Sequence, residues 1–240
     1  KRKSALTLSR MVHFTLFGIP VYIRPSFWVV LAIFGGALSI SSVEDLIYPA
    51  LFVIAGFVAI LSHEMGHALV GRKLGGGQQT IVLELFGGLT SSHGMQLTRG
   101  GRALMILAGP MMTLLLGIIS LGLTWNIVAP VMTSYNLNFW DLAISPFTAA
   151  LISPKLYILS CLIMIGEWWT ILNLLPIYPL DGGQLIAQYI RSPRKVFMTG
   201  FITAILIGLL SFQLFHGYFI PIFMALFAYS NYREYKNAPF

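Results

Sequence analysis

Long apolar blocks alternate with short polar linkers along the chain, and this pattern predicts a bundle of membrane-spanning helices. A helix needs about 20 predominantly apolar residues to cross the hydrocarbon core of a bilayer. Six apolar blocks follow one another, of which the first and the last are short: residues 27–42, 47–70, 103–125, 156–175, 196–215 and 218–229. We therefore expect an all-α polytopic membrane protein with about six transmembrane helices.

Two stretches depart from the helical pattern and favour β-structure. Residues 12–24 contain two short β-prone runs around Gly18-Ile19-Pro20, which predicts a hairpin-like element at the membrane surface. Residues 75–93 follow the second block, carry glycine at both ends of a β-prone run, and predict a β-hairpin loop that dips into the membrane. Irregular backbone is tolerated at that depth only where protein or a water-filled cavity surrounds it.

These elements predict a simple domain organisation. Residues 1–25 form an N-terminal β element, residues 26–232 form one six-span domain with its core at 47–190, and residues 233–240 form a cytoplasmic tail. Residues 126–154 are the longest predicted outer loop, and we expect a short surface helix within it. The basic N-terminus precedes no short apolar run of the kind that a cleavable signal peptide requires.

Composition and charge agree with a membrane location. Hydrophobic residues make up 57% of the chain and charged residues only 10%, whereas soluble domains carry about 25% charged residues. With the N-terminus placed in the cytoplasm, the predicted cytoplasmic segments hold every Lys and Arg except Lys155. This positive-inside asymmetry favours six spans with both termini cytoplasmic. The net charge of +7 therefore reports membrane topology, and we predict the lipid bilayer, not nucleic acid, as its partner.

The second apolar block carries the residues with the clearest chemistry, His63-Glu64-Met65-Gly66-His67. On a helix, residues four apart lie on one face, so both imidazoles can bind one zinc ion. Glu64 lies between them in sequence and is a candidate general base for a zinc-activated water. Two histidines of a packed core are the alternative, although ionisable residues inside a membrane are rarely without function.

A catalytic zinc takes three protein ligands and leaves one position for water. Four acidic or histidine side chains are candidates for the third ligand: Glu84, His93, Glu167 and Asp181. Asp181 lies in a loop that two prolines and two glycines force out of the helical conformation, at the predicted cytoplasmic level of the histidine motif. Geometry therefore favours Asp181, and Gly182-Gly183 would allow a close backbone approach.

The motifs together resemble the site-2 protease family of intramembrane zinc metalloproteases. The resemblance rests on four elements, which cover about residues 12–190: His63-Glu64-Met65-Gly66-His67, Gly87-Gly88, Ala108-Gly109-Pro110, and the run Asn173 to Gly183 that reads Asn-Leu-Leu-Pro-Ile-Tyr-Pro-Leu-Asp-Gly-Gly. The last run is most similar to the branch that contains sporulation sigma-factor processing proteases. The chain shows neither a PDZ insertion nor a CBS domain.

The resemblance implies one Zn²⁺ per chain bound by His63, His67 and Asp181, with Glu64 as the general base. It also implies that Asn173 helps to hold the substrate or the developing oxyanion, whereas the residues alone leave an interhelical hydrogen bond open. The implied activity is hydrolysis of a peptide bond in or near a transmembrane segment of a membrane protein, close to the cytoplasmic face. The implied location is a prokaryotic plasma membrane.

Two other functions share these residues. A metal transporter could use the same three ligands, but transporters often repeat their broken helices, and no second copy of either motif occurs. A non-catalytic relative would bind membrane segments without cutting them, which the intact Glu64 disfavours.

For a protease, we expect the run Thr80–Phe86 to offer a strand edge to an unwound substrate. The substrate and the oligomeric state do not follow from the sequence.

Overall fold

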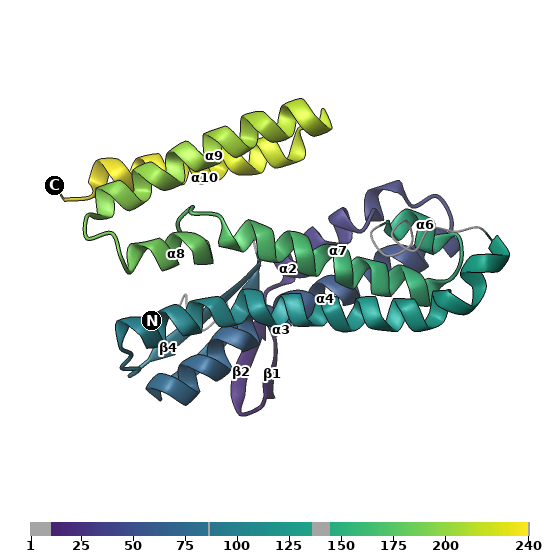
Figure 1. Ribbon diagram of the computed structural model, residues 1–240, viewed down its shortest axis with the longest axis horizontal. Helices are drawn as coiled ribbons and strands as arrows, with labels where there is room; N and C mark the ends of the chain where they lie inside the picture. The colour runs from purple at the N-terminus through teal and green to yellow at the C-terminus, as the bar shows by residue number, and fades with distance from the viewer. Residues whose placement is uncertain (1–10, 86, 136–144, 240) are drawn as a thin grey trace. The chain divides into compact units, whose positions relative to one another are not determined.

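The computed structural model describes residues 11–85, 87–135 and 145–239 of the chain (Figure 1). These residues belong to two compact units, which are described separately below. The first unit comprises Lys1–Gly101 and Ala108–Thr170, and the second comprises Arg102–Leu107 and Ile171–Phe240.

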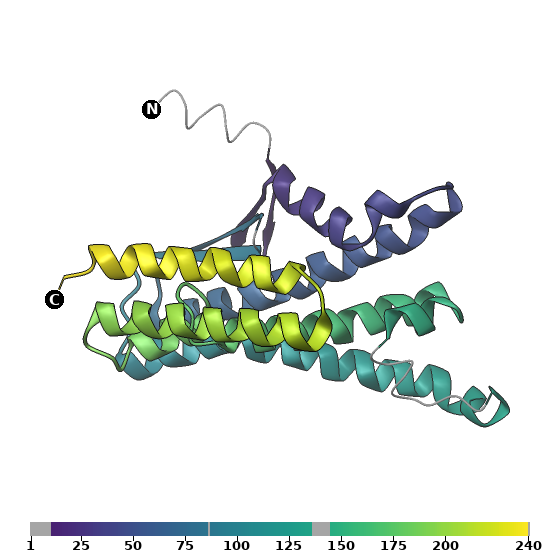
Figure 2. The same cartoon turned by 90° about the horizontal axis from the view of Figure 1, so that it is seen from above.

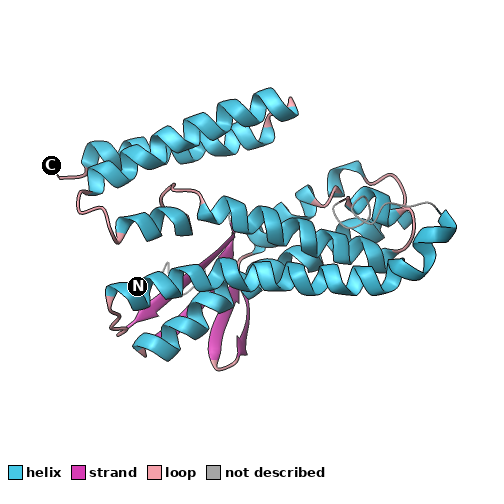
Figure 3. Ribbon diagram, viewed as in Figure 1, coloured by secondary structure: helices cyan, strands magenta, loops and turns pink. Residues whose placement is uncertain are grey.

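A four-stranded sheet belongs to the first unit (Figure 3). Its strands are β1 (Val12–Leu16), β2 (Ile19–Ile23), β3 (Gln78–Glu84) and β4 (Gly87–His93), in the order β1-β2-β3-β4. The two hairpins are antiparallel, and a parallel pairing of β2 with β3 joins them. Both predicted β elements are confirmed, and they combine into one small sheet in a protein that is otherwise mostly helical. The depth of this sheet in a membrane stays a prediction.

The sheet forms because its alternate side chains share one apolar face. Parallel pairing places Val21 beside Ile81 and Ile23 beside Leu83, and all four side chains are buried. Successive side chains of a strand point to opposite faces, so this register gathers the apolar set on one side. That set packs with residues of α2 (Pro25–Phe34) and α3 (Ile47–Gly75) in a single core.

Strand β3 is paired on both sides, with β2 and with β4. The expectation that Thr80–Phe86 exposes a free strand edge is therefore wrong over Ile81–Leu83, where β3 is paired on both sides. Sequence alone could not reveal the pairing with β2, since the two strands are separated by two helices. Among the described strands, β1 and β4 form the edges of the sheet.

Four helices in the described part of the chain are long and apolar enough to cross a membrane: Glu44–Gly75, Arg99–Ala129, Pro154–Leu174 and Pro193–Leu214. They correspond to the second to fifth predicted blocks. The first block forms only the ten-residue helix α2, which ends at Gly35, and Gly36 then adopts a positive φ of 89°. The sixth block forms α10 (Phe219–Asn237), which is not among the four. The count of six spans stays a prediction.

Two helices extend beyond their predicted ends. Helix α4 (Arg99–Tyr135) continues past residue 125 into the predicted outer loop, where the short helix α6 (Pro146–Ala150) also lies. Residues 136–144 of that loop lie outside the described residues. Helix α10 continues to Asn237, so most of the predicted tail 233–240 is helical. The polar residues that end its apolar run, such as Arg233 and Glu234, are good helix formers.

The second unit is built on a pair of helices, α9 (Pro193–Phe215) and α10, which lie side by side (Figure 2). The short helix α8 (Asp181–Ala187) and the loop before it precede this pair in the chain. Ile177 of the loop is fully buried and packs with three residues of α9 and α10: Ala204, Met224 and Ala228. The loop is therefore anchored to the helix pair by a small apolar core.

Candidate metal centre

Helix α3 brings both histidines of the predicted motif together in the interior. His63 is 2% exposed and His67 is 8% exposed. Their Nε2 atoms lie 3.1 Å apart, as expected for residues four positions apart on one helix face. The prediction that both imidazoles project toward a common point is confirmed.

The separation of the two nitrogens fits two ligands of one zinc ion. Zn–N bonds of about 2.0–2.1 Å at a tetrahedral angle place two nitrogens about 3.3 Å apart. The backbone also leaves room beside the rings, because a Cβ atom at Gly109 would lie 2.3 Å from His67 Nε2 and 2.9 Å from His63 Nε2. Gly109 of α4 therefore allows a close approach to both imidazoles that no other residue type permits.

Strand β4 fixes the carboxylate of Glu64, which is only 5% exposed. The hydroxyl of Thr90 donates a hydrogen bond to Glu64 Oε2 at 2.7 Å and lies 3.1 Å from the Glu64 main-chain oxygen. On the other side of the carboxylate, a Cβ atom at Gly88 would lie 2.5 Å from Glu64 Oε1 and 2.2 Å from its Cγ. Thr90 and Gly88 thus define the position that Glu64 can occupy.

The register of the sheet explains why these two residues reach α3. Thr90 is paired with Ile81 and Gly88 with Leu83, two residues of the face that packs on α3. Directly paired residues of antiparallel strands point to the same face. On this face, β3 presents large apolar side chains, whereas β4 presents a glycine and a hydroxyl where it meets Glu64. The sheet therefore supplies a polar contact at the one place where α3 carries a carboxylate.

Trp169 of α7 (Pro154–Leu174) also packs at this end of the sheet. A Cβ atom at Gly87 would lie 2.6 Å from its Cζ2 atom, and its ring stands edge-on to His63 with 6.4 Å between the centroids. Trp168 is 55% exposed. The two tryptophans therefore differ, and the Trp169 ring packs against one of the candidate ligands.

In the second unit, Asp181 begins α8 and is 5% exposed. The two glycines after it allow the helix to start directly against the preceding backbone. A Cβ atom at Gly182 would lie 2.1 Å from the Leu174 carbonyl oxygen, and one at Gly183 would lie 2.4 Å from the Ile177 carbonyl carbon. The two glycines were expected to allow a close approach to a partner helix, but the close contacts are made to the end of α7 and to the loop before α8.

Three buried side chains among the described residues, His63 and His67 in the first unit and Asp181 in the second, are of the types that could hold one metal ion. Two imidazole nitrogens and one carboxylate oxygen are a donor set that suits zinc. The other candidates for the third ligand have different surroundings. Glu84 forms an ion pair with Arg24 at 2.9 Å, and both His93 and Glu167 are exposed.

Asn173 lies on α7 and is 8% exposed. Its role in holding substrate stays a prediction.

The importance of three residues around the centre was not recognised from the sequence. The sequence interpretation does not single out Thr90, and it names Gly88 and Gly109 only as parts of motifs.

Comparisons with known proteins bear on the fold and on the kind of metal. No family model matches the chain. Zinc metalloprotease MJ0392 of Methanocaldococcus jannaschii is 29% identical over 227 residues, which cover 90% of this chain and 57% of that protein. The protein sll0528 of Synechocystis is 28% identical over 188 residues, which cover 73% of this chain and 43% of that protein. The chain thus spans about half the length of these curated relatives.

A solved structure, the site-2 protease from Methanocaldococcus jannaschii, superimposes with a TM-score of 0.59. The two chains are 24% identical, and the match covers 94% of this chain and 95% of that one. The chain therefore has the fold of a site-2 protease, and the predicted resemblance to this family is confirmed. With four helices that can span a membrane, this fold identifies an integral membrane protein.

Proposed function

We propose that this chain is an intramembrane zinc metalloprotease that hydrolyses a peptide bond in or near a transmembrane segment of another protein. One observation carries the proposal above all. Two convergent imidazoles and a carboxylate held in place by Thr90 lie buried on a helix that is long and apolar enough to span a membrane. Buried ionisable groups in such helices mark functional sites.

In this proposal His63, His67 and Asp181 would hold one zinc ion. Bound zinc lowers the pKa of water to about 7 and polarises the scissile carbonyl. The neutral imidazoles use their Nε2 lone pairs for this purpose, which agrees with the 3.1 Å between these atoms. Gly109 keeps the space beside both rings free of side-chain atoms.

Glu64 acts as the general base. Its carboxylate accepts a proton from the attacking water, whose oxygen forms a bond to the scissile carbonyl carbon. The carbon–nitrogen bond then breaks, and Glu64 returns the proton to the leaving amine. The hydrogen bond from Thr90 fixes Oε2, and we assign proton transfer to Oε1. Asn173 holds the substrate carbonyl or the developing oxyanion.

A transmembrane substrate is helical and must unwind before its peptide bonds can be attacked. Strand β4 is suited to receive the unwound segment, because it is an edge strand whose inner face touches Glu64. A peptide added along this edge would satisfy its backbone hydrogen bonds by β-augmentation. The scissile bond would then lie beside the general base.

We place cleavage near the cytoplasmic face of a prokaryotic plasma membrane, with both termini in the cytoplasm. The support is the charge asymmetry, since Lys155 is the one basic residue that a six-span topology leaves outside. The histidine motif lies in the C-terminal half of α3, and the basic pair Arg72-Lys73 follows it within the last turn of that helix. This pair would anchor that end of α3 at the cytoplasmic headgroups.

The test is cleavage of transmembrane segments by the purified protein in detergent, with Glu64→Gln as the matched variant. We expect the wild type to cleave a substrate segment, a zinc chelator to abolish cleavage, and Glu64→Gln to retain bound zinc but lose activity. A metal transporter would not lose transport in Glu64→Gln through failed proton transfer. Cleavage by Glu64→Gln at the wild-type rate would refute the assignment of the base.

A further inference from the structure

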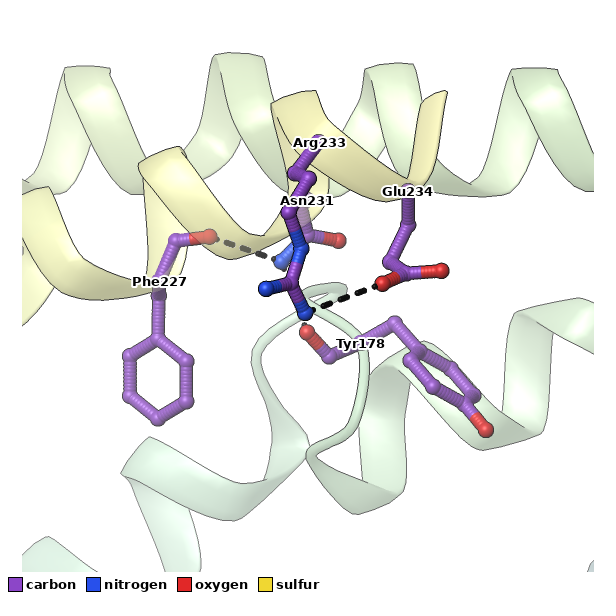
Figure 4. Close-up of polar contacts among 5 residues, drawn as sticks. All are labelled: Tyr178, Phe227, Asn231, Arg233 and Glu234. Atoms are coloured by element: carbon purple, nitrogen blue, oxygen red, sulfur yellow. Dashed lines mark hydrogen bonds and ion pairs between the residues drawn. The ribbon is translucent and has the colours of Figure 1, made fainter. Parts of the chain in front are cut away.

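Asn231 of α10 is a buried polar residue that the proposed chemistry does not use. It is 1% exposed and lies in the second unit. Its Nδ2 atom donates two hydrogen bonds, one to the Phe227 carbonyl oxygen at 2.9 Å and one to the Tyr178 carbonyl oxygen at 2.6 Å (Figure 4). The first bond stays within the helix, whereas the second joins α10 to the loop before Asp181.

The orientation of this amide follows from its partners. Both carbonyl oxygens require a donor, so only the nitrogen can face them. The Oδ1 atom of Asn231 has no hydrogen-bond partner within the described residues and packs against Gly200, where a Cβ atom would lie 2.3 Å away. A buried, unsatisfied amide oxygen is costly. The side chain is therefore committed to its two donations, although an apolar residue would suit the surrounding helix pair better.

The carbonyl that Asn231 binds lies three residues before Asp181. The loop between them is short and internally bonded: the Leu180 amide donates to the Ile177 carbonyl at 2.8 Å, and Gln184 Nε2 donates to the Pro179 carbonyl at 2.9 Å. The Tyr178 ring packs edge-on to Phe197 of α9. These contacts link the segment around the Tyr178 carbonyl to the start of α8.

We infer that Asn231 is a positioning residue for Asp181: by holding the Tyr178 carbonyl, it fixes the loop that presents this carboxylate as a metal ligand. The inference rests on the proposed function for the role of Asp181, but the clamp itself is a property of the second unit alone. Ile177 supplies an apolar anchor and Tyr178 a polar one, at adjacent positions. The burial of Ile177 fixes how closely the loop packs on α9 and α10, and the directional hydrogen bond to Tyr178 fixes the orientation of the loop backbone.

A merely structural role for Asn231 predicts something different. Asparagine can strengthen the packing of two helices in a membrane through hydrogen bonds. Replacement of Asn231 would then destabilise the α9–α10 pair as a whole. Amide exchange would rise as much in the two helices as in the loop. The distinguishing readouts are zinc affinity and local backbone exchange in residues 175–184, neither of which depends on catalytic turnover.

The experiment compares the full-length wild type with Asn231→Leu and Asn231→Ala in detergent. Zinc affinity is measured by competition with a chelator, and amide hydrogen exchange by mass spectrometry. The control is Ser211→Ala, because Ser211 is buried in the same unit and its hydroxyl donates only to the Gly208 carbonyl of its own helix. Removal of a residue that orients a metal ligand costs about 10–100-fold in affinity. We expect at least tenfold weaker zinc binding and faster exchange confined to 175–184 in both Asn231 variants, with Ser211→Ala unchanged.

Three results would overturn the inference: zinc affinity within twofold of the wild type in both variants, unchanged exchange in 175–184, or exchange that rises equally throughout α9 and α10. The alanine variant guards against misfolding caused by the larger leucine. If the wild type binds no zinc, the proposed function fails, and the exchange measurement still decides whether Asn231 holds the loop.

Discussion

Replacement of Thr90 by valine is the sharpest test of how the sheet contributes to catalysis. Valine keeps the branched shape of threonine and removes only the hydroxyl that donates to Glu64 Oε2 at 2.7 Å. A hydrogen bond to a charged group contributes about 1.5–3 kcal/mol. Because about 1.4 kcal/mol corresponds to a tenfold change in rate, we expect kcat to fall by about 10–100-fold. The Thr90 side chain faces α3 and not the open edge of β4, so KM should change little.

The assay is steady-state cleavage of a transmembrane segment in detergent, together with the zinc content of each preparation. Thr90→Ser is the matched control, since it keeps the hydroxyl and removes one methyl group, and it should retain kcat to within a few-fold. Zinc content should be equal in all three proteins. The reasoning fails if Thr90→Val keeps a kcat within twofold of the wild type, or if Thr90→Ser loses as much activity as valine.

Three further predictions concern the same centre. Gly88→Ala places a Cβ atom 2.2 Å from Glu64 Cγ, so kcat should fall by about 100-fold while zinc stays bound; normal turnover would contradict the packing described for Glu64. Gly109→Ala places a Cβ atom 2.3 Å from His67 Nε2. Its zinc affinity, measured by chelator competition, should be weaker by at least about tenfold, and an unchanged affinity would refute this prediction. Synthetic substrates with single N-methylated amides around the scissile bond should lose cleavage at every second position, because an added strand uses alternate amides; equal losses at all positions would exclude pairing with β4.

The long helices were predictable because length and apolar character are read directly from the sequence. Helix α7 begins at Pro154 and α9 at Pro193, where proline suits the first turn of a helix. The ends were harder to predict. Apolar residues continue after Gly35, but the helix stops there, and α4 continues past residue 125 because loss of hydrophobicity does not end a helix.

The candidate metal ligands were predictable because their spacing and residue types carry the chemistry. His63 and His67 share a helix face wherever that helix lies, and Asp181 stands in a loop marked by proline and glycine. The supporting residues were not predictable in the same way. Thr90 acquires its role only through pairing with Ile81, and the importance of Gly109 depends on how closely α4 approaches α3. Both facts belong to tertiary packing.

X-ray absorption at the zinc edge of the purified protein tests the central claim most directly, that two imidazoles and a carboxylate hold one zinc ion. We predict about one zinc per chain, with nitrogen and oxygen ligands at about 2.0–2.2 Å, a signal from two imidazole rings, and no sulfur shell at about 2.3 Å. His67→Ala should remove one imidazole from the spectrum or abolish binding. A protein without zinc, a sulfur ligand, or a spectrum that His67→Ala leaves unchanged would contradict the account.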